Sequence, residues 1–174
     1  MSETGIVRRM DGLGRIVIPK ELRRLLGLKA GDETEIAADG DRLTVRRHSR
    51  FAGFVTVCGR AVSYAASMTG CEVFLTAADR VEAACGRHAK DMLSRPLTAE
   101  FSALAREEKT LSLRREGGFE PVKGVCIEGE LVAVPVRAAS GEVAGCLFAV
   151  GDNAEGHVGA LEFAAGLLGS VCAE

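Results

Sequence analysis

The side chains best suited to chemistry in this chain are arginines gathered near its N-terminus. Arg8, Arg9 and Arg15 flank one predicted turn, and Arg23 and Arg24 fall in a short predicted helix. A guanidinium is planar and permanently charged, and it can hold a phosphate or the edge of a guanine base through two parallel hydrogen bonds. Between residues 1 and 29 there are seven Lys or Arg and three Asp or Glu, an excess that solvated surface residues would also produce. Charge alone therefore leaves both interpretations open, a nucleic-acid surface and an ordinary solvated one.

Other kinds of chemistry have less support in the sequence. The three histidines fall in separate parts of the chain, and neither a Ser-His-Asp arrangement nor a complete phosphate-binding motif is found. Cys85 and His88 form a Cys-x-x-His pair that could bind a metal, but we favour a surface histidine beside a buried thiol. The six cysteines are irregularly spaced without a Cys-x-x-Cys pair, which predicts buried free thiols in a reducing compartment. We expect no catalytic residue, no cofactor and no metal.

The basic residues are positioned by a small module rich in short strands. Asp11-Gly12 is a strong hairpin-turn signal, and a β-branched stretch ends at Pro19. Pro19 can occupy the first turn of a helix, for which Gly27 is the predicted end. Gly31-Asp32 and residues 39–41 mark further turns. We predict strands over residues 5–10, 15–18, 33–38 and 42–47 and a helix over residues 20–26.

Charge and composition both change near residue 50. Residues 1–50 hold eleven Lys or Arg against eight Asp or Glu, a net charge of +3, whereas residues 51–174 hold eleven against sixteen, a net charge of −5. We therefore expect a basic domain over residues 1–52 and an acidic domain over residues 53–174. No apolar stretch reaches the roughly eighteen residues that span a bilayer. The N-terminus lacks an apolar signal segment, so we expect a cytoplasmic, nucleoid-associated protein without a membrane partner.

The first domain is too small to be stable by itself. About a dozen medium apolar side chains bury too little surface to offset the entropy of ordering such a domain. Without a disulfide or a metal, oligomerisation is the remaining means of stabilisation. We therefore predict a two-fold symmetric homodimer whose two copies interleave their strands around one shared core.

Residues 4–24 and 28–32 carry a resemblance to a known family. Leu-Gly-Arg at 13–15, Ile-Pro at 18–19 and Glu-Leu-Arg-Arg at 21–24 resemble the swapped-hairpin DNA-binding domain of the AbrB family of bacterial transition-state regulators. The resemblance implies an interleaved dimer that lays a basic face on double-stranded DNA. The family's DNA-contacting arginines correspond to Arg8, Arg15, Arg23 and Arg24, and Arg9 and Lys20 are further basic residues beside them. The implied DNA-binding set is Arg8, Arg9, Arg15, Lys20, Arg23 and Arg24.

The second domain is predicted to combine helices with apolar strands. The hydrophobic pattern predicts helices over residues 54–69, 88–93, 99–109 and 156–173. It predicts strands over residues 72–77, 81–85, 110–115, 124–127, 131–137 and 143–150, with a mobile loop at 116–121. This order resembles a GAF domain, an antiparallel sheet with helices on both sides. The fold class of the chain is therefore predicted to be α+β.

The resemblance to GAF domains bears on partners and ligands. In relatives the first and last helices pack against those of a neighbour, which implies a homotetramer, although the last helix fits an intramolecular core equally well. The Asn-Lys-x-x-x-Asp/Glu pattern of cyclic-nucleotide-binding members is missing. An unknown small-molecule effector stays open, and Phe74, Phe119 or Phe148 could instead fill the interior.

These observations favour a sequence-selective DNA-binding transcription regulator, activator or repressor. The layout of a basic AbrB-type domain followed by a sensor-like domain resembles regulators of spore-forming bacteria, which implies action on sporulation genes. A toxin-neutralising antitoxin that represses its own gene is the first alternative, but such proteins usually carry a disordered toxin-binding tail. A GAF-type redox enzyme that uses Cys85 or Cys126 is the second.

Overall fold

The chain folds into two units. The computed structural model describes residues 5–26, 28, 30, 34–77 and 79–172, and the chain divides into Met1–His48, here the basic unit, and Ser49–Glu174, here the sheet unit. Phe51 is almost fully buried in the core of the sheet unit. The structural division therefore falls before Phe51, whereas the division expected from charge and composition falls after residue 52.

The described residues of the basic unit form one hairpin and one short helix. Strands β1 (Thr34–Asp39) and β2 (Arg42–Arg47) pair antiparallel around a turn in which Gly40 has a φ of 60°. Helix α1 (Lys20–Leu25) starts directly after Pro19, as the sequence predicted. The expected helix end at Gly27 and the turn at Gly31-Asp32 lie outside the described residues.

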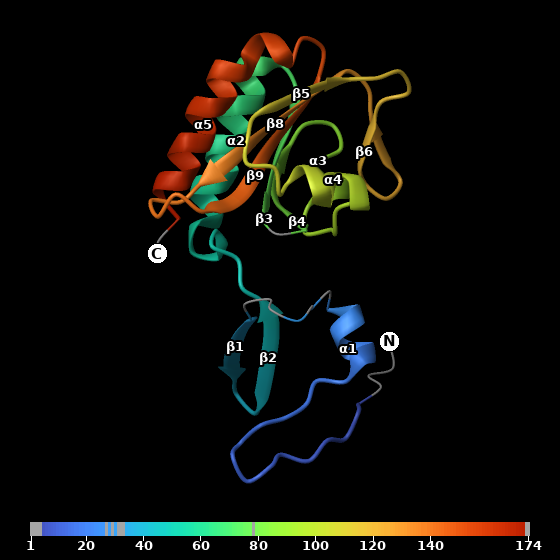
Figure 1. The fold of residues 1–174 in the computed structure, drawn as a ribbon, viewed down its shortest axis with the longest axis vertical. Helices are drawn as coiled ribbons and strands as arrows, with labels where there is room; N and C mark the ends of the chain where they lie inside the picture. Colours follow the sequence, from blue (N-terminus) through green and yellow to red (C-terminus); the bar gives the residue numbers. More distant parts are fainter. Residues whose placement is uncertain (1–4, 27, 29, 31–33, 78, 173–174) are drawn as a thin grey trace. The chain divides into compact units, whose positions relative to one another are not determined.

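The strands predicted over residues 5–10 and 15–18 are not formed within the single chain. Both segments lack strand pairing in the described structure and run as a long loop before α1 (Figure 1). Their turn is closed by two backbone bonds, from the Asp11 N–H to the Arg15 carbonyl at 3.1 Å and from the Gly14 N–H to the Asp11 carbonyl at 3.0 Å. A β-strand needs a neighbouring strand to which its backbone groups can bond. These two segments are joined by a hydrogen-bonded turn but do not form a ladder with each other.

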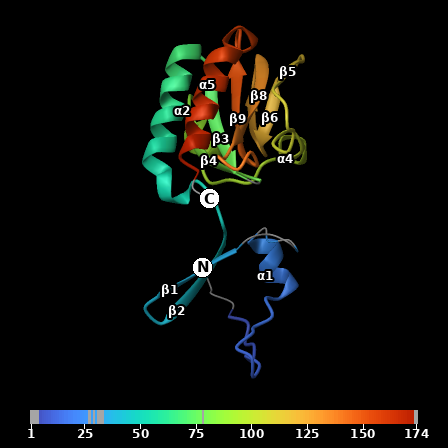
Figure 2. The ribbon, with the colours of Figure 1, turned by 60° about the vertical axis from the view of Figure 1, so that its left-hand side comes forward.

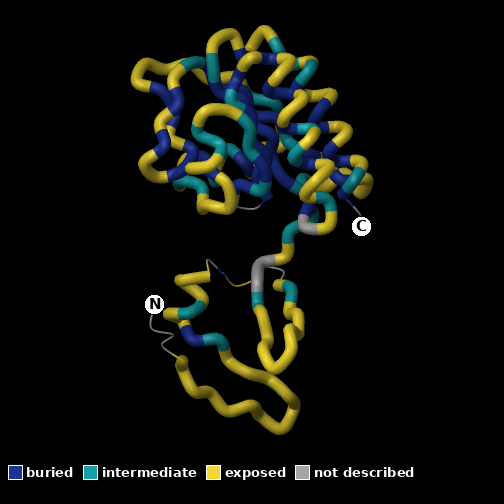
Figure 3. Tube along the Cα trace, turned by 180° about the vertical axis from the view of Figure 1, so that it is seen from behind, coloured by how far each residue is buried: buried dark blue, intermediate teal, exposed yellow. Residues whose placement is uncertain are grey.

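The basic unit exposes most of its apolar side chains. Among its described residues, Pro19 and Leu28 alone are buried, and the unit is almost entirely exposed along its trace (Figure 3). Val7 is 89% exposed and Leu25 is 80% exposed. The other large exposed apolar residues are Ile6, Met10, Leu13, Ile16, Val17, Leu26, Ile36 and Leu43.

The sheet unit is built on a five-stranded antiparallel sheet with the order β4-β3-β9-β8-β5. Its central strands are apolar on both faces because helices or loops cover both. Phe74 pairs with Phe148, which in turn pairs with Ala133 in the next strand. The strands are β3 (Glu72–Ala77), β4 (Arg80–Cys85), β5 (Leu111–Arg114), β8 (Glu130–Arg137) and β9 (Val143–Gly151).

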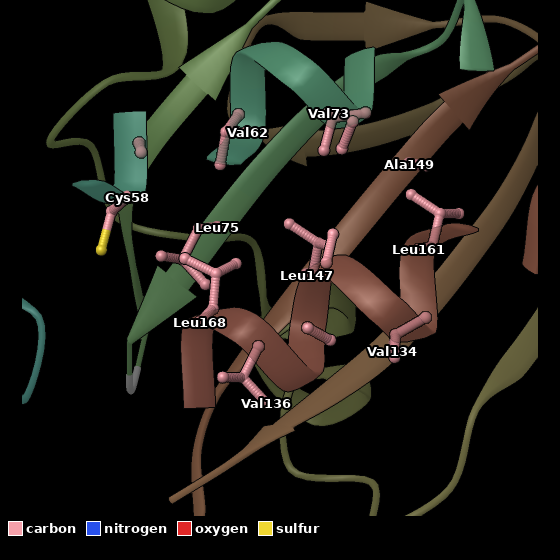
Figure 4. Close-up of a cluster of buried hydrophobic side chains, with 14 of the residues drawn as sticks. Cys58, Val62, Val73, Leu75, Val134, Val136, Leu147, Ala149, Leu161 and Leu168 are labelled. Atoms are coloured by element: carbon pink, nitrogen blue, oxygen red, sulfur yellow. The ribbon is translucent and has the colours of Figure 1, made fainter. Parts of the chain in front are cut away.

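Two long helices cover one face of this sheet. Helix α2 (Val55–Thr69), preceded by a short 3₁₀ turn η1 (Ala52–Phe54), lies beside α5 (Val158–Ser170), preceded by η2 (Glu155–His157) (Figure 2). Cys58 and Val62 of α2 and Leu161 and Leu168 of α5 meet strand residues such as Leu75 (Figure 4). Gly70 ends α2 with a φ of 70°, in the left-handed region that favours glycine.

The other face carries a second core beneath smaller elements. Helices α3 (Ala89–Met92) and α4 (Ala99–Leu104) and a hairpin of β6 (Phe119–Val122) and β7 (Val125–Ile127) enclose it. Thr98 caps α4 by accepting a hydrogen bond from the Phe101 N–H at 3.5 Å. Helices and an antiparallel sheet therefore combine in the α+β, GAF-like arrangement that the sequence predicted.

Several predicted boundaries in the sheet unit are wrong. The helix expected over 99–109 ends at Leu104. The Glu108 carbonyl, shortly before β5, instead accepts a hydrogen bond from the Arg137 guanidinium at 2.6 Å. The expected loop at 116–121 contains most of β6, because residues 125–127 supply a pairing partner. The prediction of buried thiols is wrong for exposed Cys126 and half-buried Cys85.

Candidate nucleic-acid interface

Three of the six predicted DNA-binding residues flank the turn of the basic unit. Arg8 and Arg9 precede this turn and Arg15 follows it, and all three are exposed. The Arg8 guanidinium donates to the neighbouring Val7 carbonyl at 3.3 Å. No strand ladder holds this part of the loop within one chain, so its shape depends on the turn itself.

Asp11 organises the turn through both of its carboxylate oxygens. Oδ1 accepts the backbone N–H groups of Leu13 and Arg15, each at 2.9 Å, and Oδ2 accepts the Nε–H of Arg15 at 2.8 Å. The Arg15 backbone N–H, followed by its guanidinium, holds the pKa of Asp11 below its ordinary value of 3.8. The carboxylate is therefore ionised at neutral pH, and it fixes one edge of the Arg15 guanidinium.

The other three predicted residues lie on helix α1. Lys20 is its first residue, and Arg23 and Arg24 lie in its last turn. Spacings of three and four residues place these three side chains on one side of a helix. All three are exposed, and positive charge in the last turn also suits the helix dipole. The Leu28 N–H donates to the Arg23 carbonyl at 2.8 Å, which anchors the chain after the helix.

All six predicted residues therefore lie on the surface of the basic unit, in two groups. Lys20, Arg23 and Arg24 share a helical face, while the remaining three surround the turn. Sequence reasoning used Asp11 only as a turn signal and missed its contact with Arg15. An aspartate four residues before an arginine, with glycines between them, is the signal that could have indicated this contact.

His88 and Cys126 of the sheet unit each have a polar partner. His88 is half-buried, and its Nδ1 lies 2.7 Å from a Glu72 oxygen while its backbone N–H donates to the other oxygen at 2.8 Å. The expected surface histidine is thus a residue paired with a carboxylate. Cys126 Sγ contacts the Gly117 carbonyl at 3.3 Å. The described residues contain no group of three or more His, Cys, Asp or Glu placed to hold a metal ion.

Burial keeps most thiols of the sheet unit protonated. Desolvation raises the pKa of Cys58 to about 11 and also raises the pKa of Cys146 above its ordinary value. The same cause raises the pKa of Cys71 and of Cys172. Since the thiolate is the reactive form, these four side chains behave as core residues.

Aromatic rings fill the core beneath α3 and α4. The Phe74 ring stacks on Phe148 with centroids 5.2 Å apart, and Phe101 lies 5.1 Å from Phe148. These rings and Phe119 are almost fully buried, so the three phenylalanines named from the sequence do occupy the interior.

No helix in the part of the chain that the structure describes has both the length and the apolar character needed to cross a membrane.

Comparisons with known proteins match both units. Residues 7–52 match the family described as "Antidote-toxin recognition MazE, bacterial antitoxin". Transition state regulatory protein AbrB of Bacillus subtilis (strain 168) is 48% identical over 48 residues, which cover 28% of this chain and 50% of that protein. The free methionine-R-sulfoxide reductase of Thermoplasma acidophilum covers 69% of this chain and 93% of its own, with 15% identity and a TM-score of 0.53. That likeness shows the fold of the sheet unit alone.

A further relative matches a longer part of the chain. Stage V sporulation protein T of Bacillus subtilis (strain 168) is 33% identical over 122 residues, which cover 65% of this chain and 68% of that protein. This match is longer than the basic unit, so it includes residues of the sheet unit. The chain therefore belongs to the family of stage V sporulation protein T.

Proposed function

We propose that this protein is a sequence-selective, DNA-binding transcription regulator. The observation that carries the proposal is the exposure of all six basic side chains of the AbrB-type module, three of them on one face of α1. Such a surface binds phosphates through charge and can read base edges through arginine. The relatives are named as a sporulation protein and a transition state regulatory protein, which supports regulation rather than catalysis.

The basic unit acts as an intertwined dimer in this proposal. Ten large apolar residues of this small unit are exposed in the single chain, including those of the two loop segments that the sequence predicts as strands. A second copy would supply both the missing strand partners and the cover for these side chains. The six basic residues would then occur twice on one assembly.

The sheet unit joins dimers into a homotetramer in this proposal. On α2, exposed Val57, Tyr64 and Met68 follow a spacing of seven and four residues, which places them on one side of the helix. On the adjacent α5, Phe163 is 69% exposed and Leu167 is exposed one turn later. A second copy packing these helices against its own would bury this apolar surface.

The targets and the location follow from kinship. We place the protein in the cytoplasm, on the nucleoid, regulating sporulation genes, because its relative is named for a stage of sporulation. A small-molecule effector of the sheet unit has less support, because Phe74, Phe101, Phe119 and Phe148 fill the core beneath α3 and α4.

Selection of binding sites from a random-sequence duplex library with the full-length protein tests the proposed function. We expect one enriched sequence class, bound much more tightly than a scrambled duplex of equal length in fluorescence anisotropy. If each dimer neutralises about six to ten phosphates, affinity falls by about 10³–10⁵ between 50 and 200 mM salt. Binding without enrichment, or no binding at all, would contradict the proposal.

Neutralisation of a toxin is the second candidate function. The match of residues 7–52 to the MazE antitoxin family favours it. Residues that follow the match form a packed sheet unit with two cores, unlike a disordered toxin-binding tail. Coexpression of this protein with the product of the adjacent gene distinguishes the two functions. If that product is toxic, an antitoxin would restore growth, whereas a transcription regulator would not.

A further inference from the structure

Asp11 is a carboxylate in the middle of a basic surface. It lies between Arg9 and Arg15, and the Asp11 side chain is 43% exposed while that of Arg15 is 72% exposed. A negative charge beside the phosphates of DNA weakens the electrostatic part of binding. Asp11 should therefore make another contribution to binding that offsets this electrostatic cost.

The two oxygens of Asp11 have separate tasks. Oδ1 accepts the backbone N–H groups of Leu13 and Arg15 and so stabilises the turn, whereas Oδ2 accepts, among the described residues, only the Nε–H of Arg15. A carboxylate whose task was the turn alone would need only the first set of bonds. The second bond restrains the guanidinium itself.

The Nε contact leaves the far end of the Arg15 guanidinium available. Among the described residues the two terminal amino groups of Arg15 have no hydrogen-bond partner. Those two groups form a planar pair of donors that matches the O6 and N7 acceptors of guanine in the major groove. A guanidinium held at its Nε edge presents this pair in one orientation, whereas an unrestrained arginine samples many.

We propose that Asp11 is a positioning residue that orients Arg15 to read a guanine base. In this assignment Arg15 contributes sequence discrimination, while the arginines of α1 contribute phosphate contacts. The inference rests on the proposed DNA-binding function. It adds that Arg15 recognises a base and that Asp11 orients the Arg15 side chain.

Asp11→Asn separates the two tasks of the side chain. The asparagine oxygen can still accept the two backbone N–H groups, but its amide nitrogen cannot accept the Nε–H of Arg15. The full-length variant is titrated against the library-selected duplex and against a scrambled duplex. We expect the ratio of the two affinities to fall about tenfold or more, as removal of one good bidentate pair with a base implies. Binding to the scrambled duplex should stay the same or tighten, because a negative charge has been removed.

Arg15→Lys provides a second measurement that does not depend on the turn. Lysine keeps the positive charge but has neither an Nε–H nor a planar donor pair. We expect the same reduction in discrimination with an unchanged slope of affinity against salt. If Arg15 bound a phosphate instead, Arg15→Ala would remove one phosphate-binding charge from each copy of a dimer and flatten that slope by about 1.8.

The outcomes distinguish failure of this inference from failure of the proposed function. If wild-type protein prefers no duplex, both fail. If wild-type protein discriminates and Asp11→Asn tightens binding to both duplexes equally, the positioning role is overturned while the DNA-binding function stands. An Arg15→Ala variant with a flattened salt slope and unchanged discrimination overturns base reading by Arg15.

Discussion

Replacing Arg23 by alanine tests whether helix α1 holds DNA through phosphate contacts. Arg23 is exposed in the last turn of α1, on the side that it shares with Lys20 and Arg24. Each phosphate contact contributes about −0.9 to the slope of log affinity against log salt, so removing Arg23 from both copies of a dimer flattens the slope by about 1.8. Between about 50 and 200 mM salt, the affinity gap between wild type and Arg23→Ala should therefore shrink by about tenfold.

The assay is a fluorescence anisotropy titration of the full-length protein at several salt concentrations. Arg42→Ala is the matched control, because Arg42 is an exposed arginine in β2 of the same unit and lies outside the predicted set. The control should keep the wild-type slope. Circular dichroism checks that both variants retain the folded content of the wild type.

Parallel salt dependences for Arg23→Ala and wild type would refute phosphate binding by α1. A flattened slope in Arg42→Ala of the same size would show that any arginine of the basic unit serves, and that charge alone governs binding.

Three further predictions concern the sheet unit. A Cβ at Gly145 of β9 would lie 2.1 Å from a backbone carbonyl oxygen of β3, so Gly145→Ala should lower the free energy of unfolding in urea by about 1–3 kcal/mol. Gly59→Ala on α2 meets no atom within 4 Å and should instead leave stability unchanged or raise it by up to about 1 kcal/mol, and equal losses in both variants would contradict the packing. Phe74→Ala removes a ring from the aromatic cluster and should cost about 3–5 kcal/mol in the same measurement, whereas a loss below about 1 kcal/mol would mean that the cluster is loosely packed. Brief iodoacetamide treatment at mildly alkaline pH, read by peptide mass spectrometry, should modify exposed Cys126 well before Cys58, whose pKa burial raises to about 11; prior labelling of Cys58 would contradict its burial.

Elements with a strong local signal were predictable from the sequence. Helix α2 has a clear apolar stripe and a glycine at its end, and the observed helix over Val55–Thr69 differs from the prediction by one residue. Strand β2 over Arg42–Arg47, which follows the turn at residues 39–41, was predicted with the observed bounds. In each case the residues that decide the structure lie within one turn or one hairpin.

Elements that depend on a distant partner were less predictable. The segments 5–10 and 15–18 have strand-like composition but lack a ladder partner within the single chain. Conversely, Phe119–Val122 forms β6 in a stretch with loop composition because residues 125–127 pair with it. The contact between Asp11 and Arg15 depends on the exact path of a turn, which composition does not specify.

The amino-acid sequence by itself determined the two-part organisation, the α+β class and the six basic residues of the AbrB-type module, because charge segregation, residue periodicity and short motifs are local properties. Only the tertiary structure decided which thiols are buried, where aromatic rings close the second core, and which oxygen of Asp11 holds Arg15. These features arise where segments from different parts of the chain, or the two ends of one turn, meet in space. Their energies depend on distances that the order of residues does not record.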